Sequence, residues 1–207
     1  MLLDVCGVLQ SAKALVFDFD GTLVDSNPIK WSAFEQLFSD FPSQLDKIMR
    51  YCREGNHTPR WVKFRTIYET ILRLPYTPEA EASLMKRYEE ATTRQIIAAP
   101  EIPGATRFLK RAAAHYQTAL LSSTPHKILS VILRERGWKD YFGTVQGAPV
   151  HKSAWLKTFF QECRLRKGQL VFFGDAREDL EAAKEADCPF IQMGSDLPDF
   201  TELVPLG

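Results

Sequence analysis

Polar and acidic side chains follow three apolar segments of this sequence, each at the point where the segment ends. They are Asp18 and Asp20 after residues 14–17, Ser122 and Ser123 after residues 118–121, and Asp175 and Asp179 after residues 170–173. A further charged residue, Lys152, precedes the third segment. If the three segments are parallel strands, their carboxyl ends meet at one edge of a sheet, and these groups are expected around a single crevice.

Several carboxylates around one crevice need a cation among them. Two ionised carboxylates ~4 Å apart repel by several kcal/mol at an effective dielectric constant of ~20. The donors in these motifs are oxygen atoms, with no histidine or cysteine, which favours a hard cation, and Mg²⁺ is the common cellular choice. Lys152 adds a second positive charge. Together these charges predict a site for a phosphoryl group.

Each motif by itself has a simpler explanation. The acidic run at residues 18–22 could be a calcium loop, although it lacks a third ligand and a distal Glu at the required spacing. Residues 174–179 could be an acidic helix start. Ser122 alone would suggest a turn, and Lys152 alone would suggest a surface lysine. It is their order along the ends of strands in one sheet that predicts a common site.

The chain after residue 103 alternates between predicted helices and strands. Strands are predicted at residues 14–19, 118–122, 143–146, 170–173 and 190–193, and helices at residues 105–116, 125–136, 152–164 and 178–186. This alternation is typical of βαβ units. The first strand is apolar and must be buried in the same sheet. The predicted fold class is therefore α/β, with a Rossmann-like parallel sheet.

Residues 27–97 have a different pattern, with apolar side chains at helical spacing and no strand signal. Proline at the start of three segments, at Pro28, Pro59 and Pro78, is typical of the first helical position, and Ser43 is a candidate cap. We expect a small α-helical bundle inserted into the α/β domain. The predicted domains are a core of residues 1–26 and 98–207 and an inserted helical domain of residues 27–97.

Composition and charge exclude several other classes. The 207 residues carry 26 basic and 26 acidic side chains, which gives no basic field for general nucleic-acid binding. The four cysteines and four histidines lack the spacing of a zinc site, and the cysteines are expected to be reduced. No apolar run reaches the ~18 residues of a membrane span, and residues 1–14 are interpreted as a mature N-terminal extension. We expect a cytoplasmic monomer or homodimer.

Four motifs together resemble those of the haloacid dehalogenase-like (HAD) hydrolase superfamily, of the phosphoglycolate-phosphatase-like type with an inserted helical cap. The motifs are Asp18-Phe19-Asp20-Gly21-Thr22-Leu23-Val24-Asp25-Ser26, Leu120-Leu121-Ser122-Ser123, His151-Lys152-Ser153 and Gly174-Asp175-Ala176-Arg177-Glu178-Asp179. The resemblance extends over essentially the whole chain. Ser153 stands where this family often has proline, which leaves Lys157 as an alternative to Lys152 for the third motif.

The resemblance implies a role for each residue of the crevice. Asp18 is expected to attack phosphorus and form an aspartyl-phosphate. Asp20 is expected to protonate the leaving alkoxide and then to activate water. Ser122 is expected to hold phosphoryl oxygens, with Ser123 beside it in the substrate site, and Lys152 to neutralise the nucleophile and the phosphate. The carboxylate of Asp20 argues against dehalogenation, in which no alkoxide is protonated.

The same resemblance implies a Mg²⁺ site and a class of substrate. The ion is expected on the carboxylate of Asp18, the backbone carbonyl of Asp20 and the carboxylate of Asp175, while Asp179 acts through water or orients Lys152. The implied activity is hydrolysis of a small phosphorylated metabolite. The sequence does not identify which metabolite.

The helical cap is expected to carry the selectivity for substrate. Gly55 is expected in a loop facing the core, and Arg60 and Lys63 share a helix face because they are three residues apart. Both are candidates for binding the part of the substrate away from the phosphoryl group, and His57 is a further candidate. The alternative is that Arg60 and Lys63 form a solvated helix face.

Three other functions are compatible with a fold of this type. A sugar phosphomutase would pass the phosphoryl group to a second substrate hydroxyl on the same core. A non-catalytic binding module would be expected to lack Asp18 or Asp20, and both are present. Phosphonate hydrolysis would need a Schiff-base lysine in the cap, for which Lys63 is the candidate.

Overall fold

The computed structural model describes residues 4–55 and 58–203. The chain divides into two compact units. The first, here called the α/β unit, comprises Met1–Asp25 and Ala99–Gly207, and the second, the helical unit, comprises Ser26–Ala98. Both boundaries lie one residue from the positions expected from the sequence. The catalytic and cap roles of the two units stay predictions.

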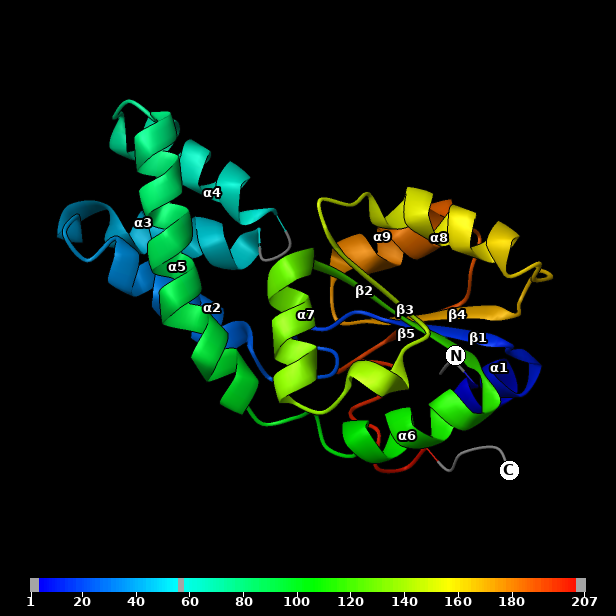
Figure 1. Ribbon diagram of the computed structural model, residues 1–207. Helices are drawn as coiled ribbons and strands as arrows, with labels where there is room; N and C mark the ends of the chain where they lie inside the picture. Colours follow the sequence, from blue (N-terminus) through cyan, green and yellow to red (C-terminus); the bar gives the residue numbers. More distant parts are fainter. Residues whose placement is uncertain (1–3, 56–57, 204–207) are drawn as a thin grey trace. The chain divides into compact units, whose positions relative to one another are not determined.

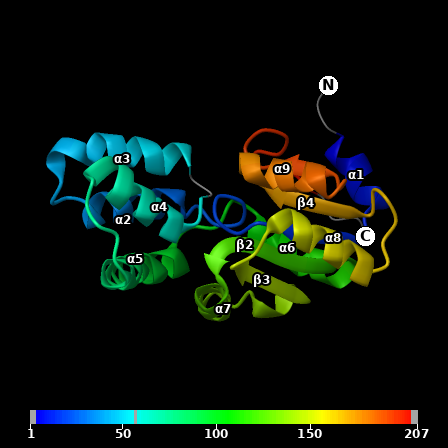
Figure 2. The same ribbon diagram turned by 90° about the horizontal axis from the view of Figure 1, so that it is seen from above.

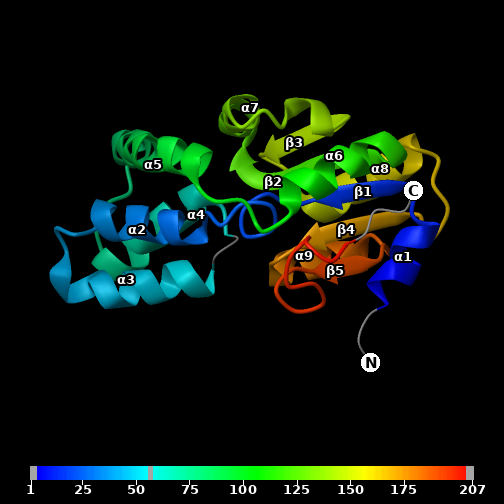
Figure 3. The ribbon, with the colours of Figure 1, turned by 90° about the horizontal axis from the view of Figure 1, so that it is seen from below.

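The described part of the α/β unit is built on a parallel five-stranded sheet with the strand order β3-β2-β1-β4-β5 (Figure 3). The strands are β1 at Ala14–Phe17, β2 at Gln117–Pro125, β3 at Thr144–Ala148, β4 at Leu170–Gly174 and β5 at Phe190–Gln192. β1 is central and all four of its residues are buried, which explains its continuous apolar sequence. The predicted parallel α/β sheet is confirmed.

Helices cover both faces of this sheet (Figure 1). They are α1 at Val5–Ser11, α6 at Ala105–His115, α7 at His126–Glu135, α8 at Lys152–Glu162, α9 at Arg177–Glu185 and the short 3₁₀ segment η2 at Lys139–Tyr141. On one face, α8 and α9 pack against Val16 and Phe172. On the other face, Phe108 of α6 meets Phe17, with ring centroids 6.1 Å apart.

The segment interpreted from the sequence as an N-terminal extension contains the helix α1. Asp4 caps this helix, since its carboxylate Oδ1 accepts a hydrogen bond of 3.0 Å from the backbone N–H of Gly7. Leu9 is the buried residue of the helix, and its carbonyl accepts a hydrogen bond from the hydroxyl of Tyr116. The cap and one apolar anchor thus account for a helix whose short, glycine-containing sequence gives little periodic signal.

The helical unit contains α2 at Asn27–Leu37, α3 at Pro42–Glu54, α4 at Arg60–Thr66, the π-helix η1 at Ile67–Leu72 and α5 at Pro78–Ala98. Figures 2 and 3 show α3 and α5 on opposite sides of α2. Its core is aromatic, with Phe34, Phe64 and Tyr88 in mutual contact. The prediction that Ser43 caps the second helix is wrong, because that helix already begins at Pro42 and Ser43 lies in its first turn.

The two ends of the α/β unit that border the helical unit in sequence are paired with each other. Val24 and Glu101 form an antiparallel bridge. The backbone N–H of Asp25 donates to the carbonyl of Pro100 at 3.0 Å, and that of Ile102 donates to the carbonyl of Leu23 at 2.9 Å. The chain therefore leaves and re-enters the α/β unit at one place.

Across residues 4–55 and 58–203, no helix combines the length and the apolar character that crossing a membrane requires.

Candidate active site

Lys152 joins the ends of two motifs that are far apart in the sequence. Its ammonium Nζ donates to Oδ1 of Asp18 and to Oδ1 of Asp179, each at 2.6 Å. Asp18 directly follows β1, Lys152 is the first residue of α8, and Asp179 lies in the first turn of α9. Lys157, the alternative third-motif lysine, is exposed one turn further along α8. The structure therefore brings Lys152, and not Lys157, to the acidic residues.

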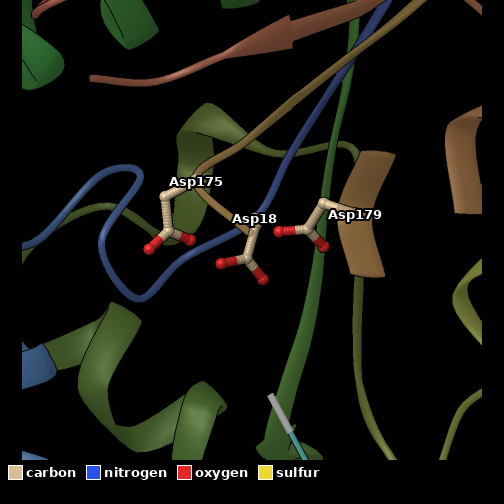
Figure 4. A group of neighbouring side chains, drawn as sticks. All are labelled: Asp18, Asp175 and Asp179. Atoms are coloured by element: carbon tan, nitrogen blue, oxygen red, sulfur yellow. The ribbon is translucent and has the colours of Figure 1, made fainter. Parts of the chain in front are cut away.

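A second acidic residue of the fourth motif completes a cluster of three carboxylates. Asp18, Asp175 and Asp179 each offer one oxygen, and these oxygens all lie within 4.8 Å of one another. Figure 4 shows Asp18 between the other two side chains. Carboxylate oxygens at such separations suit a hard divalent cation. The donor set thus fits the expected Mg²⁺.

Burial and mutual repulsion perturb the titration of this cluster. Burial raises the pKa of Asp18 to about 7, assisted by the charges of Asp179 and Asp20 and opposed by Lys152. Burial likewise raises the pKa of Asp179. Burial opposes the charge on Lys152, but its ion pairs with the two carboxylates outweigh that effect and raise the pKa of the ammonium. The single positive charge of Lys152 thus does not offset the effects of burial and of the neighbouring carboxylates on the pKa of Asp18. A divalent cation bound here would lower that pKa.

A glycine permits the close approach of the fourth motif to the sheet. A Cβ atom at Gly174, the last residue of β4, would lie 2.5 Å from the Cβ of Asp179. Oδ2 of Asp179 accepts a hydrogen bond of 3.3 Å from the backbone N–H of Ala176 at the start of α9. Because the other oxygen, Oδ1, accepts from Lys152, both carboxylate oxygens of Asp179 are hydrogen-bonded. This geometry agrees with a residue that orients Lys152.

Asp20, the second acidic residue of the first motif, is held by a residue that the sequence reasoning did not select. The hydroxyl Oγ1 of Thr124 lies 2.8 Å from Oδ2 of Asp20, and both side chains are buried. Gly21 follows with a φ of 81°, which permits the turn that links Asp20 to Val24. Thr124 lies two residues after Ser122 on β2, and this alternation is the signal that could have identified it.

The two serines of the second motif face different surroundings. Ser122 is fully buried, and its Oγ accepts a hydrogen bond of 3.0 Å from the backbone N–H of Thr124. Ser123 is exposed, as expected for the next residue of a strand. Both serines lie near the carboxyl end of β2, beside the first motif on β1.

The candidate substrate residues of the predicted cap lie in the helical unit. Gly55 ends α3, with its N–H donating to the carbonyl of Tyr51 at 3.0 Å. Arg60 begins α4, one residue after Pro59, which was expected in the first helical position. The guanidinium carbon of Arg60 lies 4.7 Å from the centroid of the Tyr88 ring. His57 lies outside the described residues.

Lys63 is 4% exposed, so the alternative of a solvated helix face is wrong for this residue. Its ammonium donates to the backbone carbonyl of Cys52 at 3.2 Å and lies 5.2 Å from the centroid of the Phe34 ring. These contacts tie α4 to α3 and α2 within the helical unit. The binding of substrate by Gly55, Arg60 and Lys63 stays a prediction.

Comparison with known proteins relates the chain to a single family. The sequence profile of the family described as haloacid dehalogenase-like hydrolase matches residues 15–193. A phosphoglycolate phosphatase of Rhodobacter capsulatus is 29% identical over 196 residues, which cover 87% of this chain and 83% of the relative. A phosphoglycolate phosphatase of Psychrobacter arcticus is 27% identical over 187 residues, which cover 84% of this chain and 79% of the relative.

Solved structures share the fold. A predicted phosphoglycolate phosphatase from Haemophilus somnus superimposes with a TM-score of 0.73 at 20% identity, covering 93% of this chain and 96% of that one. CbbY from Rhodobacter sphaeroides, solved as a mutant in complex with xylulose-1,5-bisphosphate, superimposes with a TM-score of 0.69 at 18% identity and the same coverage.

Proposed function

Because this chain belongs to the haloacid dehalogenase-like hydrolase family, we propose that it hydrolyses a small phosphomonoester in a Mg²⁺-dependent reaction that passes through a phosphorylated Asp18. The family and the enzyme class predicted from the sequence, a phosphatase, are confirmed by the match over residues 15–193 and by the phosphoglycolate phosphatases among the relatives. The metal, the intermediate and the roles of individual residues belong to the proposal.

The observation that carries the proposal is the position of Lys152 between Asp18 and Asp179, 2.6 Å from an oxygen of each. An ammonium in this place opposes the effect of burial on the pKa of Asp18 and orients its carboxylate, and it can neutralise the charge of an incoming phosphoryl group. Asp18 would attack phosphorus through its free carboxylate electron pair, and the alkoxide would leave. Ser122 would donate its hydroxyl to a phosphoryl oxygen, and Ser123 would contribute to the substrate site.

Asp20 would transfer the protons of the reaction. It would first protonate the departing alkoxide oxygen, and it would then remove a proton from the water that attacks the phosphoryl group on Asp18. The second step regenerates the carboxylate of Asp18 and releases phosphate. Asp20 is buried and adjacent to the first motif's turn, which supports its assignment to this role.

Asp18 and Asp175 would hold Mg²⁺ through their carboxylates and Asp20 through its backbone carbonyl. The ion would supply positive charge that offsets repulsion between the phosphoryl group and the nucleophile. The carboxylate cluster, with oxygens within 4.8 Å of one another, supports this site. Asp179 would orient Lys152 through their 2.6 Å ion pair.

The substrate is proposed to be a small phosphorylated metabolite, and 2-phosphoglycolate is the first candidate because the relatives are named for it. Gly55, Arg60 and Lys63 of the helical unit are proposed to contact the part of the substrate away from the phosphoryl group. Binding there would contribute selectivity, since interactions with a remote substrate part can be used to organise the reacting groups.

A screen of phosphorylated metabolites with released phosphate as the readout tests this proposal. We expect release from 2-phosphoglycolate or another small phosphomonoester, inactivation by EDTA that Mg²⁺ reverses, and no release by Asp18→Asn. Full activity in EDTA would refute the metal requirement. Isomerisation of a sugar phosphate that depends on a sugar bisphosphate, in place of phosphate release, would identify the phosphomutase alternative.

A further inference from the structure

Thr124 is a buried residue beside Asp20, the proposed acid/base group, and the reaction described above assigns Thr124 no role. Its side chain is 3% exposed, and its Oγ1 lies 2.8 Å from Oδ2 of Asp20. The threonine hydroxyl donates to this oxygen, which leaves the other carboxyl oxygen of Asp20 to carry the proton that is transferred. A hydrogen bond between two buried side chains restricts both of them, which suits this contact to fixing the orientation of the Asp20 side chain.

The backbone of Thr124 acts on a second residue of the site. Its N–H donates to Oγ of Ser122 at 3.0 Å. A serine hydroxyl has one proton to donate and two lone pairs that accept. Because this bond uses an acceptor position of Ser122, the hydroxyl proton of Ser122 stays available for a phosphoryl oxygen. Thr124 is thus bonded to both the proposed proton-transfer group and the proposed phosphoryl-binding group.

The neighbouring strand fixes the position of Thr124. The pairing of β2 with β3 shifts register between Leu121 and Pro125, the stretch that contains Thr124. Gly147 of β3 lies so close that a Cβ atom there would be 2.6 Å from the carbonyl oxygen of Thr124. The N–H of Gly147 also donates to Nδ1 of His126 at 3.3 Å. The irregular end of β2 is therefore held rigidly by close backbone packing.

We propose that Thr124 is a positioning residue: its hydroxyl holds Asp20 in the orientation needed to protonate the leaving group, and its N–H orients Ser122. This inference rests on the proposed phosphatase function. The protonation of the alkoxide occurs in the first half of the reaction, and its importance depends on the leaving group. An alkoxide is a poor leaving group and needs the proton from Asp20, whereas p-nitrophenolate is a good leaving group and departs without protonation.

The test compares kcat/KM for an alkyl phosphate, beginning with 2-phosphoglycolate, and for p-nitrophenyl phosphate at saturating Mg²⁺. Thr124→Val keeps the shape of the side chain and removes the hydroxyl, and Thr124→Ser restores the hydroxyl. We expect Thr124→Val to lose about 10- to 100-fold on the alkyl phosphate and less than about 3-fold on the aryl phosphate. Thr124→Ser is expected to recover most of the activity on the alkyl phosphate.

Thr118→Val is the matched control, because Thr118 is an equally buried threonine of β2 whose hydroxyl donates to the carbonyl of Tyr141 at 2.7 Å, away from the motif residues. This control should keep its preference between the two substrates. Thermal melting of every variant checks folding, and Thr124→Ala serves as a second hydroxyl-free variant should Thr124→Val not fold.

An equal loss on both phosphates, no loss on either, or a Thr124→Ser variant as impaired as Thr124→Val would overturn the positioning role. Failure of the proposed function gives a different result: the wild type would release no phosphate from either compound, or Asp18→Asn would match the wild type. That result would overturn the inference together with the function on which it rests.

Discussion

Two buried lysines, one in each unit, differ in what surrounds their charge. Lys152 lies between two carboxylates at the carboxyl edge of the sheet. Lys63 lies in the aromatic core of the helical unit, with its ammonium bonded to the carbonyl of Cys52 and close to the ring of Phe34. The ammonium of Lys152 pairs with formal negative charges, whereas that of Lys63 contacts a backbone carbonyl dipole and an aromatic ring.

Because their surroundings differ, the two lysines are expected to respond differently to substitution. Removing Lys152 would leave two buried carboxylates to repel each other, which is among the more destabilising changes in a protein interior. Replacing Lys63 by an apolar side chain of similar length removes its hydrogen bond to the carbonyl of Cys52 and the ammonium beside the Phe34 ring. Five predictions test this contrast, from the largest expected effect to the smallest.

Removing the carboxylate of Asp18, one of the two that Lys152 contacts, should have the largest effect on the reaction. Asp18→Asn keeps the shape of the side chain but removes the attacking charge, so we expect kcat/KM for any phosphomonoester to fall at least ~10³-fold. The melting temperature should change little. The rate of phosphate release at substrate concentrations well below KM measures the effect, and retention of more than a tenth of the activity would contradict the assignment of Asp18.

Removing the ammonium itself should affect both activity and stability. We expect Lys152→Met to lower kcat/KM by ~10²- to 10³-fold and to destabilise the fold by about 3 kcal/mol or more when no metal is added, because Asp18 and Asp179 lose their shared partner. Added Mg²⁺ should restore part of the stability. Urea unfolding with and without Mg²⁺ measures this, and Lys157→Met, on the exposed face of the same helix, is the control.

Removing the third carboxylate should weaken the metal site and leave the ion pairs of Lys152 in place. Asp175→Asn is expected to reduce activity by about 10²-fold at low Mg²⁺ and to recover partly as Mg²⁺ is raised, since the remaining ligands still bind the ion. The dependence of rate on Mg²⁺ concentration measures the change. An unchanged half-saturating Mg²⁺ concentration would remove Asp175 from the ligand set.

In the helical unit, Arg60 is the cation predicted to act on substrate. Arg60→Ala should lower kcat/KM for the natural substrate by ~10²-fold while hardly changing hydrolysis of a simple aryl phosphate, which has no second group to bind. Arg65→Ala is the control, because Arg65 lies on the same helix and also contacts aromatic rings, those of Trp61 and Tyr76. Equal losses on both substrates would indicate a structural role for Arg60.

The smallest effect is expected at the second buried lysine. Lys63→Met should lower kcat/KM for the natural substrate by about 10-fold, through loss of the substrate contact proposed for Lys63, and should change hydrolysis of a simple aryl phosphate less than about 3-fold. Comparison with Lys152→Met under the same conditions measures the contrast directly. An equal loss on both substrates would instead indicate that Lys63 acts only through the packing of the helical unit.

The sequence was most informative where one local pattern determines the outcome. The continuous apolar run at residues 14–17 indicates a strand that is buried inside a sheet. Because β1, β2 and β4 are parallel neighbours, the polar residues at their carboxyl ends lie at the same edge. The contacts among Asp18, Lys152 and Asp179 follow from that topology. The α/β fold was predicted correctly for this reason, and the family was predicted correctly from the four motifs, while the roles of the site residues stay predictions.

Contacts between distant residues were less accessible. Asp20 and Thr124 are linked by a hydrogen bond across the β1–β2 pairing. The alternation along β2 places Thr124 on the same face as Ser122, but it does not identify Asp20 as its partner. Lys63 was expected on a substrate-binding or solvated face, because a lysine in a short helix suggests exposure. Its neighbours Phe64 and Ile67 are fully buried, and the packing of α4 carries Lys63 inward with them.

The bridge between Val24 and Glu101, here called the stem, lies at the point where the helical unit is inserted into the sequence of the α/β unit. Because backbone hydrogen bonds of the α/β unit already hold the two ends of the stem together, the length of what lies between them adds little to the entropic cost of closing the loop. An insertion at this point can be lengthened, shortened or exchanged for another whose ends meet, while the sheet beneath it keeps its register. The stem thus allows the α/β unit to hold inserted helices of different lengths.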